Sequence, residues 1–291
     1  MRPLHAAAAL LVMVLWGVNF PIGKIGLQEM PPLTFMALRF GLVAVLLAPF
    51  VRPPTARMKE ILLLSFTLGF LHFALMFTGL KHADSAVAAV TVQIQVPFAT
   101  ALGVLFFRES LGWRRMAGMA LAMAGVAFLA GEPGPGSELW AVGLIIAAAA
   151  VWAFSNIQMK RLSDVNSFAL NGWMALFAVP QLALGSAVLE TGQIEAIRTA
   201  GWEVWAAIVY QAVVVVILCY GIWYFLLNRY RVNQTMPWTL LVPVFGVLAG
   251  VVMLGEPLTL RLVLGGLATI AGVAIIMLRR PDTVAAEIRN A

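Results

Sequence analysis

Charged residues are scarce in this sequence of 291 amino acids, in which Asp, Glu, Lys and Arg together make up only 11%, against about 25% in a typical soluble domain. Hydrophobic residues make up 62%, and the mean hydropathy is +0.94. One water-soluble core cannot hide that much apolar surface, so the composition excludes a disordered chain and a nucleic-acid-binding protein. It predicts an integral membrane protein whose first partner is the lipid bilayer.

Cysteine is nearly absent, because Cys219 is the only one in the chain. A lone cysteine in an apolar run forms no intramolecular disulfide, which excludes a disulfide-stabilised secreted scaffold. The three histidines, His5, His72 and His82, lie in different segments, and no motif of a metal site or a catalytic nucleophile accompanies them. The sequence therefore predicts no enzyme, no metal site and no cofactor.

Long apolar runs, in contrast, follow one another along the whole chain. A bilayer core of roughly 30 Å needs about 20 apolar residues per helix, and this length predicts ten spans. They are Leu4–Ile22, Leu33–Phe50, Ile61–Leu80, Ser85–Phe107, Trp113–Ala130, Leu139–Ile157, Phe168–Leu189, Val204–Leu227, Thr235–Leu254 and Leu262–Leu278. The first run resembles a signal peptide, but we interpret it as a membrane helix because nine similar runs follow it.

The loops between these spans differ in charge. If the N-terminus is cytoplasmic, the cytoplasmic side carries fourteen Lys and Arg and the opposite side carries Lys24, Lys81, Arg198 and Arg261, while Arg39 lies inside the second span. Cytoplasmic loops carry the excess of Lys and Arg in membrane proteins, so we expect both termini in the cytoplasm. The same excess accounts for a pI near 10.0 without nucleic acid as a partner.

The second half of the sequence repeats the first. Spans one and six share the order Trp, Asn and Lys, in Trp16, Asn19 and Lys24 and again in Trp152, Asn156 and Lys160. Spans four and five carry Pro97, Gly103, Glu109, Arg114, Gly118 and Gly125, and spans nine and ten carry Pro243, Gly250, Glu256, Arg261, Gly265 and Gly272. The spacings are 6, 6, 5, 4 and 7 residues, then 7, 6, 5, 4 and 7. This agreement predicts one five-helix unit at 1–131, a second at 138–280, and a cytoplasmic tail at 281–291.

A duplicated unit with an odd number of spans enters the membrane in the opposite orientation. Two such halves are related by a pseudo-two-fold axis in the membrane plane, as in many alternating-access carriers. The repeat also explains Arg261, which departs from the charge rule because it occupies the repeat position of the cytoplasmic Arg114. The predicted fold class is an all-α integral membrane protein with ten transmembrane helices in two inverted repeats. The alternative is that duplication only enlarged a helix bundle.

Several segments resemble one known family. They are Trp16–Phe20, Pro31–Leu33, Leu38–Phe40, Tyr220–Trp223, Leu241–Pro243 and the two stretches from Pro to Glu that end in Glu109 and Glu256. Over essentially the whole chain they are similar to the ten-helix EamA-type branch of the drug/metabolite transporter superfamily, whose members include exporters of amino acids and related metabolites. The resemblance implies a central cavity lined by spans one, three, four, six, eight and nine. It also implies a multi-pass protein of the bacterial inner membrane.

Carboxylates are missing from the middle of the predicted spans, because every Asp and Glu falls at or near a predicted loop. Proton- and sodium-driven carriers usually place an acidic residue inside the membrane, so the sequence predicts facilitated efflux. Apart from Cys219 and the tyrosines, only His72 lies near mid-membrane as a group able to carry a proton. The alternative is a neutral imidazole that is hydrogen-bonded inside the bundle.

Helical spacing selects the side chains that face the implied cavity. The predicted substrate-binding residues are Trp16, Asn19, Phe20, His72, Met76, Gln93, Trp152, Ser155, Asn156, Tyr220, Trp223, Trp238 and Thr239. Pro97 and Pro243 are predicted hinges, since an interior proline frees the carbonyl four residues earlier, which belongs to Gln93 or Thr239. Static kinks and aromatic anchors at the membrane surface are the alternatives.

A cavity lined by Trp, Tyr, Asn, Gln and Met suits a small zwitterionic or amphipathic solute, and neutral or aromatic amino acids fit best. Phosphorylated substrates such as nucleotide sugars need buried cations, for which the chain offers Arg39, Lys24 and Lys160. A nucleotide-sugar carrier, another metabolite or drug carrier, and a proton-coupled exporter are therefore the alternatives. Small residues such as Gly118 and Gly265 predict close packing within one chain, so we expect a monomer or a weak homodimer.

Overall fold

The computed structural model describes residues 2–107, 112–130, 137–230 and 236–277, and all of its regular secondary structure is helical. Glu109 of the predicted repeat and the predicted tail lie outside the described residues. The first half contains α1 (Pro3–Glu29), α2 (Pro32–Leu47), η1 (Ala48–Phe50), η2 (Thr55–Arg57), α3 (Met58–Leu64), η3 (Ser65–His72), α4 (Phe73–Lys81), α5 (Ser85–Thr91), η4 (Val92–Ile94), α6 (Gln95–Phe107) and α7 (Trp113–Ala130). The second half contains α8 (Leu139–Arg161), α9 (Ser167–Leu189), α10 (Gln193–Thr199), α11 (Trp202–Val209), η5 (Tyr210–Cys219), α12 (Tyr220–Arg229), η6 (Met236–Leu240), α14 (Leu241–Leu254) and α15 (Leu260–Met277).

Eight helical stretches within the described residues are long and apolar enough to cross a membrane. They correspond to the predicted spans one to four, six to eight and ten. The two other predicted spans are also helical: α7 has 18 residues, and Trp238–Leu254 is a shorter apolar helix. Many large hydrophobic side chains on these helices are exposed, among them Leu105, Val188 and Val252, as expected of surfaces that face lipid.

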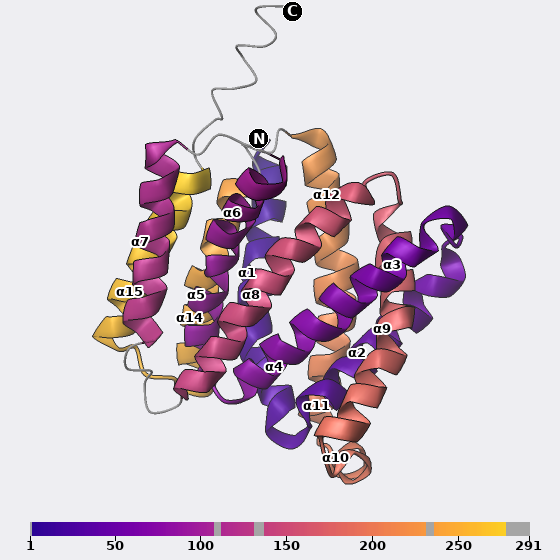
Figure 1. The fold of residues 1–291 in the computed structure, drawn as a ribbon. Coiled ribbons are helices and arrows are strands. Elements are labelled where there is room, and N and C mark those ends of the chain that lie inside the picture. The colour runs from indigo at the N-terminus through magenta and orange to yellow at the C-terminus, as the bar shows by residue number, and fades with distance from the viewer. Residues whose placement is uncertain (1, 108–111, 131–136, 231–235, 278–291) are drawn as a thin grey trace, which may run out of the picture.

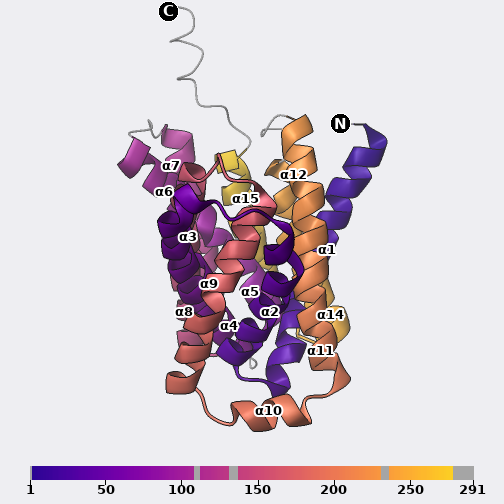
Figure 2. The same ribbon diagram turned by 90° about the vertical axis from the view of Figure 1, so that its right-hand side faces the viewer.

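The helices run between two ends of the molecule (Figures 1 and 2). The start of α1 and the end of α15 lie at one end, and α10 lies across the opposite end. The sequence predicts only a loop where α10 occurs, because seven residues are too few to give a membrane-spanning signal.

Three of the long helices are interrupted, and a fourth begins with an irregular segment within the described residues, so the irregularities match between the two halves. Spans three and eight each contain a π-helical segment, η3 and η5. Spans four and nine each contain a short 3-10 segment, η4 and η6, immediately before α6 and α14. Pro97 is the third residue of α6 and Pro243 is the third residue of α14. The structure therefore repeats its local irregularities as well as its sequence.

The two peripheral helices α7 and α15 pack directly against each other (Figure 1). A Cβ at Gly118 would lie 2.8 Å from the carbonyl oxygen of Gly272, and one at Gly125 would lie 2.7 Å from that of Gly265. The order of these contacts reverses along the two helices, so the helices run antiparallel. The close packing predicted for these small residues within one chain is confirmed.

The second pair of repeat-related helices, α2 and α9, also packs antiparallel. A Cβ at Gly172, near the start of α9, would lie 3.1 Å from Leu47 Cβ at the end of α2. A Cβ at Gly185, near the end of α9, would lie 2.9 Å from Leu33 Cδ2 at the start of α2. Between these two pairs lie α1, α8 and the interrupted helices, which carry most of the predicted site residues.

Candidate functional site

Aromatic side chains of spans one and eight, which the sequence predicts to face a common cavity, contact one another in the structure. Trp16 on α1 contacts Tyr220 and Trp223 on α12 edge to face, with ring centroids 5.7 and 5.5 Å apart. Trp223 is buried, and the half-buried Trp238 packs against the same hydrophobic cluster. This group joins a helix of the first half to helices of the second half.

A second group joins spans three and six. His72, at the end of η3, is 5% exposed, and its Nδ1 lies 2.9 Å from the carbonyl oxygen of Ala148 on α8. Its ring centroid lies 5.0 Å from that of Trp152, also on α8. Met76 is buried one turn further along. This hydrogen bond matches the alternative to a proton carrier, which is an imidazole that is hydrogen-bonded inside the helix bundle.

The polar residues of the predicted set differ in what they contact. Asn19 is half-buried, and its Oδ1 is buried without a hydrogen-bond partner among the described residues. Ser155 is fully buried, and its Oγ donates to the carbonyl of Val151 at 2.9 Å, so this hydroxyl is already used inside α8. Gln93 is buried in η4.

The remaining predicted residues lie around these groups. Phe20 packs against the main hydrophobic core and lies near Gly246 of α14, where a Cβ would stand 3.7 Å from its ring. Asn156 and Thr239 are half-buried.

The prediction that Pro97 leaves the carbonyl of Gln93 free is wrong. It accepts a hydrogen bond from the backbone N–H of Gln95, because the chain turns through η4 before α6 begins. Pro97 and Pro243 lie in the first turn of their helices, where a missing N–H costs no helical hydrogen bond. The 3-10 segments of spans four and nine thus precede the prolines and do not arise from a kink at an interior proline.

Sequence reasoning missed Gln211 in η5. This side chain is fully buried, and both Nε2 and Oε1 lack hydrogen-bond partners among the described residues. A Cβ at Gly23, one turn from Asn19 on α1, would lie 2.8 Å from Gln211 Nε2. The signal was present, because Gln211 is the only amide or charged side chain between Val204 and Cys219.

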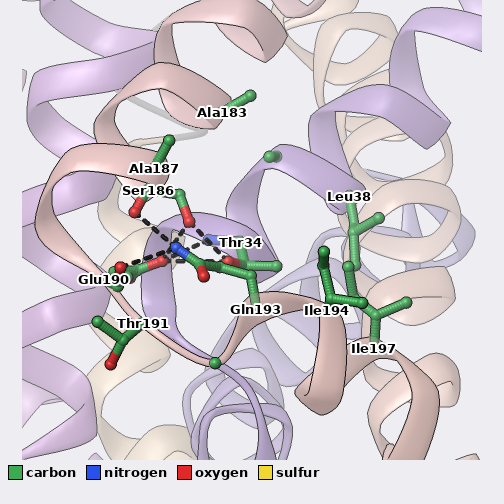
Figure 3. Close-up of a pocket in the computed structure, with 12 residues that line it drawn as sticks. Thr34, Leu38, Ala183, Ser186, Ala187, Glu190, Thr191, Gln193, Ile194 and Ile197 are labelled. Atoms are coloured by element: carbon green, nitrogen blue, oxygen red, sulfur yellow. Dashed lines mark hydrogen bonds between the residues drawn. The ribbon is translucent and has the colours of Figure 1, made fainter.

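A cavity of about 650 Å³ opens near the α10 end, between α2, α9 and α10 (Figure 3). Glu190 lies at its edge and accepts hydrogen bonds from the backbone N–H groups of Leu33, at 2.7 Å, and Thr34, at 3.1 Å. Gln193 donates to the carbonyls of Ser186 and Glu190. None of the predicted site residues lines this cavity. The Glu190 carboxylate is held by the backbone N–H groups at the start of α2.

A charged cluster joins α1, α5 and the end of α14 beside a cavity of about 270 Å³. Lys24 Nζ lies 3.7 Å from Asp84 Oδ1 and 4.0 Å from Glu256 Oε1. Glu256 is buried and accepts backbone hydrogen bonds from Ser85 at 2.6 Å and Ala86 at 2.8 Å. The carboxylate therefore caps the start of α5 and fixes it to the start of α15 through the turn after α14.

Comparisons with known proteins agree with this architecture. The model of the EamA-like transporter family matches residues 4–131 and again residues 139–278. A probable amino-acid metabolite efflux pump of Salmonella typhimurium is 37% identical over 276 residues, which cover 92% of each chain. A protein of the same description from Escherichia coli is 34% identical with the same coverage. A solved crystal structure, 19% identical and aligned over 100% of both chains, has a TM-score of 0.64 and shares the fold. The chain therefore belongs to the EamA-like transporter family of the drug/metabolite transporter superfamily and is a multi-pass membrane transporter, not an enzyme.

Proposed function

We propose that the protein exports neutral and aromatic amino acids and related small metabolites by alternating access, without ion coupling. Its Salmonella and Escherichia relatives are described as probable amino-acid metabolite efflux pumps, which supports this substrate class. The same relatives support a place in a bacterial inner membrane. The charge difference between the loops supports a cytoplasmic location for both termini.

The proposed architecture has ten membrane helices in two inverted halves, residues 1–131 and 138–280, around a central cavity. The antiparallel packing of α7 with α15 and of α2 with α9 supports the inversion, since each pair joins one helix to its own repeat counterpart. Movement of one inverted half against the other is the usual basis of alternating access.

One observation carries the proposed site: both aromatic groups contain members from both halves. Trp16 of the first half meets Tyr220 of the second, and His72 of the first half meets Trp152 of the second. A movement of one half against the other must change these contacts. Aromatic faces with nearby amide groups suit an amino acid that has an apolar side chain.

The uncoupled mechanism is supported by where the described carboxylates lie. Each is in a loop or at a helix end, and the two that are buried, Asp84 and Glu256, already interact with Lys24. A movable charge inside the membrane is the usual coupling element, and the described carboxylates do not supply one.

Reconstitution of the full chain into proteoliposomes tests the proposed function. Saturable uptake of labelled neutral and aromatic amino acids, stimulated by the same amino acid on the far side and independent of imposed pH and sodium gradients, is the expected result. Flux that requires a proton gradient would favour the proton-coupled exporter. Absence of amino-acid flux, with flux of nucleotide sugars, would favour that carrier class.

Variants of the two aromatic groups link the flux to the proposed site. Trp16→Ala and Trp152→Ala are expected to lower the initial rate at least tenfold while folded protein remains in the membrane. Trp113→Ala is the matched control, since Trp113 is 71% exposed at the start of α7 and is expected at the membrane surface. Full activity in both site variants would contradict the proposed location.

A further inference from the structure

Arg39 is a positively charged side chain buried among apolar groups. It lies about two turns inside α2, roughly 10 Å from the start of the helix at about 1.5 Å per residue, and is only 3% exposed. Its Cζ lies 4.6 Å from the ring centroid of Phe73 and 5.3 Å from that of Phe40. Its Nη1 lies 3.6 Å from Met36 Sδ. The guanidinium therefore contacts aromatic rings and a thioether within the proposed membrane span.

These contacts do not compensate the charge. No carboxylate among the described residues pairs with Arg39, and its Nε has no hydrogen-bond partner there. A buried ion without a counter-charge is strongly disfavoured, and cation–π contacts offset only part of that cost. A guanidinium also keeps its proton. A charge retained inside a membrane under these conditions points to a functional site.

Arg39 lies beside the proposed substrate site. The ring of Phe73, which faces the Arg39 guanidinium, also contacts the His72 ring edge to face, with ring centroids 4.8 Å apart. Its helix α2 packs against α4 and against η5, and η5 carries the fully buried Gln211 with its two unpartnered amide atoms. Within the part of the chain that the structure describes, Arg39 Nε and Gln211 Nε2 are thus buried donors without acceptors, one from each half.

We propose that Arg39 binds the carboxylate of the transported solute and that Gln211 supplies a further hydrogen bond in the same site. The substrate class is then small solutes with a free carboxylate, which include the amino acids of the proposed function on which this inference rests. A planar guanidinium can donate two parallel hydrogen bonds to a carboxylate. The solute supplies the counter-charge that the described residues lack.

A phosphorylated solute fits this arrangement less well. A phosphate group carries up to two charges and three acceptor oxygens, so it calls for more than one cation. Lys24 is already held by Asp84, by Glu256 and by the carbonyl of Ala83, to which its Nζ donates. One guanidinium with one amide matches the single charge of a carboxylate.

Binding to the purified full chain in nanodiscs tests this inference without depending on transport. The probes are L-phenylalanine, L-leucine and 3-phenylpropionate, each compared with its amide, and the readouts are thermal stabilisation and the Kd from tryptophan fluorescence. We expect the wild type to bind the acids and not the amides. In Arg39→Gln the Kd for the acids should rise about 10- to 100-fold, because hydrogen bonds to a charged group are worth about 1.5–3 kcal/mol. Arg198→Gln, on the exposed surface of α10, is the matched control and should behave as wild type.

The outcomes separate this inference from the proposed function. Equal binding of acids and amides, no binding of any acid, or unchanged discrimination in Arg39→Gln would each overturn the carboxylate site. Discrimination in binding without amino-acid flux would support the site and reject the proposed function. If Arg39→Gln does not fold, Arg39→Lys and Gln211→Leu replace it. Arg39→Lys should keep the preference for acids but bind them with a several-fold higher Kd. Gln211→Leu should also raise the Kd for the acids several-fold. Wild-type affinity for the acids in both variants would contradict the inference.

Discussion

The hydrogen bond at His72 leads to a test of whether this residue carries protons. His72 Nδ1 donates to the carbonyl of Ala148, and an Asn side chain keeps a donor but cannot carry a proton. His72→Asn should therefore show the same response to a pH gradient as the wild type, with a lower initial rate because the aromatic ring beside Trp152 is lost. His72→Ala should lower the free energy of unfolding by about 1–3 kcal/mol. Initial rates with and without the gradient, and unfolding in SDS, measure these effects. Loss of a gradient-dependent component in His72→Asn would make His72 the proton carrier.

Residue roles could be predicted only in part from the sequence. Helical spacing predicted that Trp16 and Trp152 face inward, because side-chain direction along a helix follows from its period, and in the structure each contacts a ring of the other half. It could not reveal that Ser155 bonds to its own helix or that no carboxylate of the described residues pairs with Arg39. Both facts depend on the distances between side chains in the packed structure. Gln211 could not be found from the repeat, because this residue is not part of the pattern that the two halves share.

The antiparallel pair α7 and α15 predicts a severe packing defect at the element scale. A Cβ at Gly272 would collide with backbone atoms of Ala122 and Gly118, which cannot rotate away as a side chain can. Gly272→Leu should therefore lower the free energy of unfolding by about 3 kcal/mol or more, the upper end for overpacking. Gly143→Ala on α8 is the control, since its Cβ meets no atom within 4 Å. Equal thermal stability of the two variants in detergent would contradict this packing.

The cap that Glu256 places on α5 gives a second prediction at this scale. Its carboxylate accepts the N–H groups of Ser85 and Ala86 and lies 4.0 Å from Lys24 Nζ. Glu256→Gln removes the charge and turns one acceptor into a donor, so stability should fall by about 1–3 kcal/mol. Glu195→Gln, exposed on α10, should change it by less than about 0.5 kcal/mol. Unfolding in SDS measures both, and an unchanged Glu256→Gln would mean that this carboxylate does not hold the helices together.

Most helices could be predicted from hydropathy, because each apolar run has the length that a bilayer requires. The interruptions could not. A hydropathy window averages over about 19 residues, whereas η3, η4, η5 and η6 are local changes in hydrogen bonding that depend on neighbouring helices. Pi-helical segments often occur at functional sites, and η3 and η5 end at His72 and Cys219, next to the two aromatic groups.

For the whole molecule, the internal repeat predicted more of the structure than the composition did. Matched spacings in the two halves predicted a duplicated five-helix unit with halves of opposite orientation. Irregular segments that occur in pairs, and repeat-related helices that pack antiparallel, are the structural features that such a duplication produces. Both features occur, in η3 with η5, in η4 with η6, and in α7 with α15. The sequence could not predict which side chains are in contact. A repeat shows which helices correspond to each other, but side-chain contacts depend on how the helices pack.

Orientation in the membrane is the last prediction, and the single native cysteine makes it testable. Cys219 is fully buried, so a membrane-impermeant maleimide should leave it unlabelled in the folded protein. Thr199→Cys, at the end of α10, and Lys59→Cys, on α3, each introduce one exposed thiol at opposite ends of the molecule. With both termini cytoplasmic, intact cells should label only Thr199→Cys, and permeabilised cells should label both. Labelling of Lys59→Cys alone in intact cells would contradict this orientation. Both termini, and the loops that carry the excess of Lys and Arg, would then lie outside the cell.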